Sequence, residues 1–136
     1  MKATELRMND WVLVDGEPMK IAETDLTYFS AWKKDGTFCG KIGYEAAEPI
    51  ILTEDMLEKG DWDVDSFDEE CAAWSWINKG CQLELYIDKF AKEDEWAVFV
   101  YDEENEPIGY SLRNIKYVHE LQHLLWALGV EKEVEV

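Results

Sequence analysis

The chain has 136 residues, the length of one ordinary domain or of two very small ones, and 47% of its residues are hydrophobic, which is enough to build a core. Seven Trp, six Tyr and five Phe add a large apolar area, so intrinsic disorder is excluded. Thirty-one acidic and 13 basic residues give a net charge of -18, which repels phosphate backbones and anionic lipids. Nucleic acid and membranes are therefore not expected as direct partners.

The first residues predict two β-hairpins. The run Trp11 to Val14 is followed by Asp15-Gly16, a turn that tolerates positive φ, and by a second run from Met19, with Pro18 suggesting an edge strand. The stretch "LTYFSAWKKDGTFCGKIGY" repeats this design around the turn at residues 33–36. About four short strands in the first 45 residues outline a small SH3-like barrel.

The middle of the chain predicts one short helix and a return to strands. Thr53 is a candidate N-cap and Gly60 a candidate C-terminal cap. We interpret "DWDVDSFDEE" as a polar connector between two halves of the chain. The stretch "CAAWSWINKGCQLELYID" predicts strand, turn and strand, with a helix over residues 68–77 as the competing interpretation.

The last third predicts a β-meander followed by a helix. "EWAVFVY" and "IGYSL" are typical of strands, with "DEENEP" as the turn between them. From Asn114, a possible N-cap, the sequence has helical period up to Leu128 and stops at Gly129, and the tail "VEKEVEV" could add an edge strand. The expected class is α+β: an SH3-like barrel in residues 1–50 and, in residues 51–136, an antiparallel sheet packed by the C-terminal helix.

The segment "YVHELQHLL" contains His119, Glu120 and His123 in the H-E-x-x-H order of zinc peptidases. These are the only two histidines in the chain, whereas zinc normally takes three protein ligands. On a helical projection, an apolar stripe is formed by Val118, Leu121, Leu125 and Leu128. Because the three motif residues fall on the opposite side, we expect them to face solvent and to hold no metal. A metal-dependent hydrolase that uses these three residues is kept as an alternative.

Other partial motifs predict no site. Asp61, Asp63 and Asp65 alternate like the start of an EF-hand loop, but the required Gly, apolar residue and Glu are missing at positions six, eight and twelve. "GTFCGK" lacks the spacing of a phosphate loop. The aromatic stretches "TYFSAW" and "AAWSWI" favour a core over a base-stacking platform, since only Lys33 and Lys34 cluster nearby. No catalytic, cofactor-binding or metal-binding residue is predicted, and no cofactor.

The compartment is expected to be the cytoplasm. "MKATELRMND" has no apolar stretch of the kind found in signal peptides. Three cysteines at positions 39, 71 and 81 are an odd number at wide spacing, which suits reduced thiols better than disulfides.

Three stretches carry a resemblance: "ELRMNDWVLVDGEPMKI", "EPIILTEDML" and "KYVHELQHLLWALGVEKEVEV". Together they resemble a family of small uncharacterised proteins of gut anaerobes and their phages or mobile elements, over about a third of the chain. In that family's pattern, glutamine would replace Glu120 and asparagine would replace His123. The resemblance therefore implies that the apparent zinc motif arose by local substitution in a helix without metallopeptidase character.

The function expected from these features is a non-catalytic protein-interaction or accessory module with an unknown protein partner. An acidic mimic of nucleic acid, or an inhibitor of a nucleic-acid-binding protein, is the third hypothesis beside the hydrolase.

Overall fold

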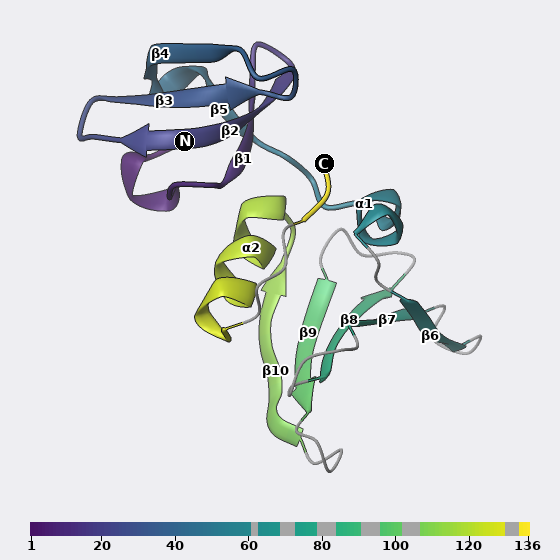
Figure 1. Ribbon diagram of the computed structural model, residues 1–136. Helices are drawn as coiled ribbons and strands as arrows, with labels where there is room; N and C mark the ends of the chain where they lie inside the picture. The colour runs from purple at the N-terminus through teal and green to yellow at the C-terminus, as the bar shows by residue number, and fades with distance from the viewer. Residues whose placement is uncertain (61–62, 69–72, 79–83, 91–95, 102–106, 130–133) are drawn as a thin grey trace. The chain divides into compact units, whose positions relative to one another are not determined.

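The computed structural model describes residues 1–60, 63–68, 73–78, 84–90, 96–101, 107–129 and 134–136. It shows an α+β protein, as predicted, with two five-stranded antiparallel sheets and two α-helices in these residues (Figure 1). The chain divides into two compact units. One comprises residues 1–52, 117–127 and 136, and the other comprises residues 53–116 and 128–135.

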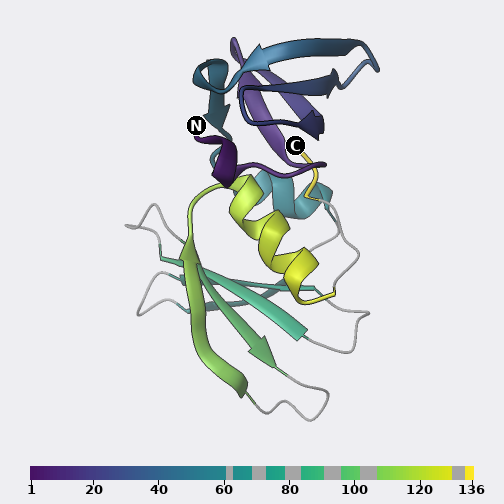
Figure 2. The ribbon, with the colours of Figure 1, turned by 90° about the vertical axis from the view of Figure 1, so that its left-hand side faces the viewer.

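The sheet of the first unit is formed by consecutive strands near the N-terminus. Its strands are β1 (Trp11–Val14), β2 (Glu17–Thr24), β3 (Tyr28–Lys33), β4 (Phe38–Gly43) and β5 (Ala47–Pro49). They lie in the order β4-β3-β2-β1-β5, with a 3-10 helix at Tyr44–Ala46 before β5. In Figures 1 and 2 the strands appear in purple to blue.

Both predicted hairpins are confirmed. Asp15 and Gly16, with φ of 51° and 80°, form the two-residue turn between β1 and β2, and Gly36 with φ of 89° lies in the second turn. Pro18 suggested that its strand lies at the edge of the sheet. This prediction is wrong, because β2 lies between β1 and β3. Pairing with β3 begins only at Met19, so the missing N–H of Pro18 costs no hydrogen bond there.

The first sheet is open. Within residues 1–60, all of which are described, β4 pairs only with β3 and β5 only with β1, so the two edges do not join. The closure expected of an SH3-like barrel is therefore not observed.

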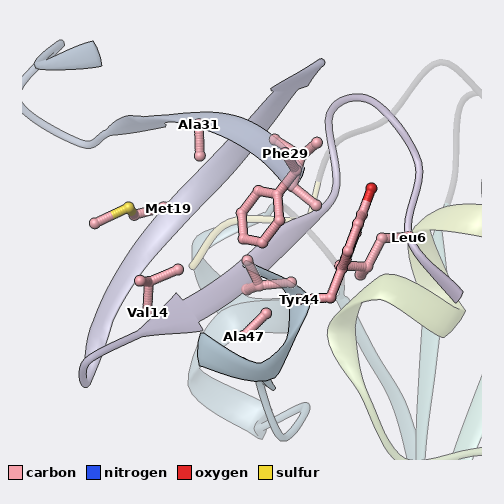
Figure 3. Close-up of a cluster of buried hydrophobic side chains, with 9 residues drawn as sticks. Leu6, Val14, Met19, Phe29, Ala31, Tyr44 and Ala47 are labelled. Carbon is pink, nitrogen blue, oxygen red and sulfur yellow. The ribbon is translucent and has the colours of Figure 1, made fainter. Parts of the chain in front are cut away.

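One face of this sheet builds the core of the first unit (Figure 3). Alternate residues of β1, β2 and β3 point inward, as the period of two requires. Leu6 and Tyr44, from the segments that flank the sheet, complete the cluster, and the Tyr44 ring packs on Phe29 with centroids 5.3 Å apart. The buried members are Leu6, Val12, Val14, Met19, Ile21, Phe29, Ala31, Tyr44 and Ala47.

The sheet of the second unit is a simple meander (Figures 1 and 2). Its strands are β6 (Asp63–Asp68), β7 (Ala73–Asn78), β8 (Glu84–Phe90), β9 (Trp96–Tyr101) and β10 (Pro107–Ile115), in the order β10-β9-β8-β7-β6.

Two interpretations of this region are resolved. The competing helix over residues 68–77 is wrong, since Ala73–Asn78 is a strand. The polar connector is also wrong, because Asp63–Asp68 pairs with β7, with Val64 opposite Trp76 and Phe67 opposite Trp74. The aspartates around Val64 and Phe67 hide this strand in the sequence.

The two helices are short. Helix α1 (Glu54–Lys59) ends at Gly60, as predicted, and α2 spans Val118–Ala127. The predicted N-cap at Asn114 is wrong, because Asn114 still pairs with Ala97 inside β10. Gly129, with φ of 72°, follows α2 as expected of a C-terminal cap. Residues 134–136 form no strand, and the rest of the predicted tail strand lies outside the described residues.

In the described part of the chain, neither helix is long and apolar enough to cross a membrane. The sequence placed the C-terminal helix in residues 51–136, whereas the structure groups residues 117–127 with the first sheet. The contacts of α2 with the N-terminal segment explain this grouping and create the first candidate site.

Candidate functional site

The start of α2 is fixed by backbone contacts to the segment that follows β5. The Val118 N–H donates to the Ile50 carbonyl at 2.9 Å, and Tyr117 forms an antiparallel bridge with Ile51. Val118, Leu121 and Leu125 are fully buried, which confirms three members of the predicted apolar stripe. Leu128 lies beyond the end of the helix and is half-buried.

Glu120, the glutamate of the apparent zinc motif, contributes to the helix N-terminus. Its Oε1 accepts a hydrogen bond from the Tyr117 N–H at 3.3 Å. Tyr117 precedes the first helical residue and Glu120 is the third residue of the helix, so the contact is the glutamate half of a capping box. This geometry gives Glu120 a structural role.

The loop before β1 holds a buried carboxylate at Asp10, which is 1% exposed. Asn9 adopts a positive φ of 73°, which Asn tolerates, and the resulting turn brings the Asp10 N–H within 3.2 Å of the Arg7 carbonyl. Asp10 Oδ2 accepts from the Arg7 N–H at 2.7 Å. The Asp10 carbonyl accepts from the Ile21 N–H at 2.8 Å, which ties the loop to β2.

His123 of α2 is the second partner of this carboxylate. Its Nε2 lies 2.9 Å from Asp10 Oδ1 and 2.7 Å from Oδ2. Because a carboxylate only accepts, the proton of the imidazole lies on Nε2 and is donated to Asp10. The His123 side chain is 22% exposed and the Asp10 side chain 2% exposed. The pair therefore joins two segments that lie 113 residues apart in the sequence.

His119 lies beside this pair and is buried, with 7% exposure. Its ring stacks on Tyr117, with centroids 5.8 Å apart, and meets the His123 ring edge-on at 5.7 Å. Burial lowers the pKa of His119, and the negative charge of Asp10 opposes this shift. Its Nδ1 is buried and has no hydrogen-bond partner among the residues that the structure describes.

The expectation that His119, Glu120 and His123 all face solvent is therefore wrong. His119 is buried, and Glu120 and His123 are partly buried. The helical projection assumed that only the apolar stripe of α2 is covered by the rest of the protein. In the structure, the N-terminal loop with Asp10 covers a second side of the helix.

The same contacts bear on metal binding. His123 Nε2, the atom that binds zinc in H-E-x-x-H sites, donates to Asp10, and Glu120 caps the helix. No group of three His, Cys, Asp or Glu side chains placed to hold a metal ion occurs among the residues that the structure describes. Whether the protein takes up zinc stays a prediction.

The remaining sequence candidates are dispersed. Asp63 and Asp65 lie in strand β6, which is not the loop geometry of an EF-hand, and Asp61 lies outside the described residues. Cys39 is half-buried in β4 and packs against the core of the first unit. Cys71 and Cys81 also lie outside the described residues. "GTFCGK" spans the end of a hairpin turn and the start of β4, as expected.

A second candidate site lies on the face of the first sheet opposite its core. In β3, Phe29 and Ala31 point into the core, while Tyr28 and Trp32 are each 46% exposed. The interpretation of "TYFSAW" as core is therefore correct for alternate residues only. Phe38 of β4, 52% exposed, pairs directly with Trp32, and their ring centroids are 4.8 Å apart.

This aromatic row continues across the sheet. Trp32 pairs with Lys20 of β2, and Lys20 pairs with Trp11 of β1, which is half-buried. Directly paired residues of antiparallel strands share a face. We call the set Trp11, Tyr28, Trp32 and Phe38 the aromatic face.

At the Tyr28 end of this face is a hollow of about 200 Å³. It contains two carboxylates, the Ser30 hydroxyl and one ammonium group. We call it the acidic hollow. Its lining residues are Glu23, Thr24, Asp25, Tyr28, Phe29, Ser30 and Lys41.

Sequence reasoning missed the Asp10 partner of His123 and the outward aromatic face. No local pattern indicates Asp10, because the contact exists only after folding. The aromatic face had a signal, since the alternation in "TYFSAW" places Tyr28 and Trp32 on the side opposite Phe29 and Ala31.

Comparisons with family models, with curated proteins and with solved structures find no match for this chain. The assignment of a function therefore depends on the geometry of these two sites.

Proposed function

We propose that the protein is a non-catalytic interaction or accessory module that binds a partner protein through the aromatic face. The observation that carries this proposal is the cluster of Tyr28, Trp32 and Phe38, each about half exposed on one side of a sheet whose other side is a complete core. Aromatic side chains are enriched at the centres of protein interfaces. Large apolar groups gathered on one face commonly mark binding sites.

The setting of this module is also part of the proposal. We place it in the cytoplasm, as a component of a phage- or mobile-element-derived system, on the basis of its composition and of the sequence resemblance. The connectivity of the first sheet, four meandering strands and a fifth beside the first, supports an SH3-like relationship for this unit.

The hydrolase alternative receives no support from the described residues. A metallopeptidase needs both histidines on zinc and a glutamate beside the metal-bound water. Here His123 donates to Asp10 and Glu120 accepts from the Tyr117 N–H. These contacts assign both residues to the stability of the fold.

The acidic mimic or inhibitor remains a second candidate because of the charge distribution. Residues 53–136 contain 22 acidic and seven basic residues, whereas residues 1–52 contain nine and six. The net charge is therefore -15 for residues 53–136 and -3 for residues 1–52. The excess negative charge of residues 53–136 would attract a basic protein to this part of the chain.

A capture experiment tests the interaction module. The full chain is immobilised and incubated with lysate of its source, beside the double variant Trp32→Ala/Phe38→Ala. Leu26→Ala is the matched control, because Leu26 is 95% exposed but lies in the turn before β3. We expect a partner that the wild type and the Leu26 variant retain and the double variant loses.

Retention of the same partner by the folded double variant would contradict the aromatic face as the site. If that partner is basic and is released by moderate salt, the acidic inhibitor becomes the better description. Circular dichroism of each variant verifies that the fold is intact.

A further inference from the structure

The aromatic face and the acidic hollow lie on the same side of strand β3. Tyr28, Ser30 and Trp32 alternate with the core residues Phe29 and Ala31, so their side chains point to the face opposite the core. Tyr28 and Ser30 line the hollow, and Trp32 pairs with Phe38 at the other end of the strand. A ligand that lies along β3 would contact both.

The Trp32 end offers an apolar surface. The rings of Trp32 and Phe38 are tilted by 58° to each other and leave about half of each side chain in water. Covering these rings with an aromatic or aliphatic side chain would remove that apolar area from water, which favours binding.

The Tyr28 end offers groups that recognise a cation. Asp25 Oδ1 accepts from the Tyr28 and Thr27 N–H groups, both at 2.8 Å. These hydrogen bonds lower the pKa of Asp25, so its carboxylate is ionised at neutral pH. Glu23 supplies a second carboxylate, against one ammonium group at Lys41.

One further group suits a cationic ligand. The half-exposed Tyr28 ring can accept a cation over its face. The net charge of the whole chain, -18, adds a long-range attraction for a basic partner.

We infer that these two ends bind one extended segment of a partner protein, which places an aromatic or aliphatic side chain on Trp32 and Phe38 and an Arg or Lys side chain in the acidic hollow. This inference rests on the proposed function and specifies its partner. Tyr28 and Trp32 are four residues apart in a strand, a span of roughly 13 Å. The partner's two anchors are therefore expected about four residues apart in an extended segment.

A single-stranded nucleic acid fits this face less well. Stacking platforms for bases need positive charge along the backbone path. Lys33 is paired with Glu17 at 3.1 Å, and the Lys34 ammonium donates to the Val136 carbonyl oxygen. These pairs occupy the two lysines that cluster in the sequence. Lys20 in the aromatic row and Lys41 in the hollow are too few to neutralise several phosphates together, and the net charge of -18 repels phosphates.

Strand addition along the edge of β4 is also disfavoured. Lys41 has a positive φ of 56°, and the pairing of β3 with β4 shifts register between Phe29 and Ala31. A bulge and a lysine on an edge strand hinder the docking of another strand. The face of the sheet is the better surface.

Selection from a random peptide library displayed on phage tests the inference with the full chain as the target. Enriched peptides are synthesised with a fluorescent label and titrated against wild type and variants. We expect enriched sequences to combine an aromatic or aliphatic residue with Arg or Lys at the spacing given above. A labelled poly-dT oligonucleotide is titrated in parallel.

Matched variants separate the two ends. Trp32→Ala should weaken the selected peptides roughly tenfold or more, as the loss of an aromatic anchor does. The double variant Glu23→Gln/Asp25→Asn keeps the shapes and the hydrogen-bond acceptor of Asp25 but removes both charges. It should weaken basic peptides roughly three- to tenfold and leave peptides without a basic residue unchanged. Leu26→Ala should bind like wild type.

The failures are distinguishable. The inference is overturned if the peptides lose affinity for Trp32→Ala but carry no Arg or Lys, or if they bind the Glu23→Gln/Asp25→Asn variant as tightly as wild type. The proposal of an interaction module is not affected by either result. Selection that yields no Trp32-dependent peptide overturns both. Saturable binding of the oligonucleotide that Trp32→Ala abolishes overturns the inference in favour of nucleic acid.

Discussion

At the scale of single residues, the contact of His123 with Asp10 is expected to contribute measurably to stability. Removing the imidazole in His123→Ala leaves a buried carboxylate with the Arg7 N–H as its remaining described donor. A hydrogen bond to a charged group contributes about 1.5 to 3 kcal/mol, so we expect a loss of that size in urea unfolding. His123→Gln can still donate an N–H and should lose less. Equal stability of His123→Ala and wild type would contradict this role.

His119 predicts a pH dependence of stability. Its pKa is lowered by burial, so the folded protein binds fewer protons at this site than the unfolded chain. The free energy of unfolding must therefore fall as the pH drops below 6.5, the ordinary pKa of histidine. At higher pH His119 is neutral in both the folded and the unfolded chain, so it has no such effect on stability. The test compares urea midpoints of wild type and His119→Gln between neutral and mildly acidic pH. The wild type should lose more stability than the variant, and parallel curves would contradict the argument.

At the scale of elements, helix α2 is predicted to be structural through its buried stripe. Leu125 is fully buried, so Leu125→Ala should cost about 2 to 5 kcal/mol, as truncations of buried leucines do. Ala127→Gly, at the exposed last residue of the helix, is the control for a general effect on helix formation and should cost about 1 kcal/mol or less. A thermal melt of Leu125→Ala that matches wild type would remove this role.

Elements with a local signature were predictable from the sequence. The hairpin at Asp15-Gly16 and the helix that ends at Gly60 follow from turn and cap chemistry, and both are confirmed. Strand β6 was missed because its apolar residues, Val64 and Phe67, are interspersed with aspartates, and its pairing with β7 is not visible in the local sequence. The start of α2 was missed because β10 continues through Asn114.

The candidate sites were predictable only in part for the same reason. The spacing of His119 and His123 identified them as candidate site residues. Their environment could not be predicted, because Asp10 is 113 residues from His123 in the sequence and meets it only in the folded chain. The aromatic face follows from strand alternation once β3 is known to be half-buried. The acidic hollow depends on the turn at Asp25 and on the conformation of Lys41, which no sequence pattern specifies.

At the scale of the whole molecule, the net charge of -18 predicts a stabilising effect of salt. Carboxylates within about 10 Å of one another repel less as the ionic strength approaches 0.1 M. We expect the melting temperature to rise modestly from low to moderate sodium chloride. A melting temperature that falls over this range would indicate that attractive ion pairs outweigh the repulsion.

The H-E-x-x-H segment is expected to stabilise the fold and to bind no metal, which distinguishes an interaction module from a hydrolase. Elemental analysis of the full chain, purified without a histidine tag, measures its zinc content. We expect substoichiometric zinc that does not change in His123→Ala, together with the loss of stability described for that variant. One tightly held zinc ion per chain, lost in His123→Ala, would show instead that the segment is a metal site.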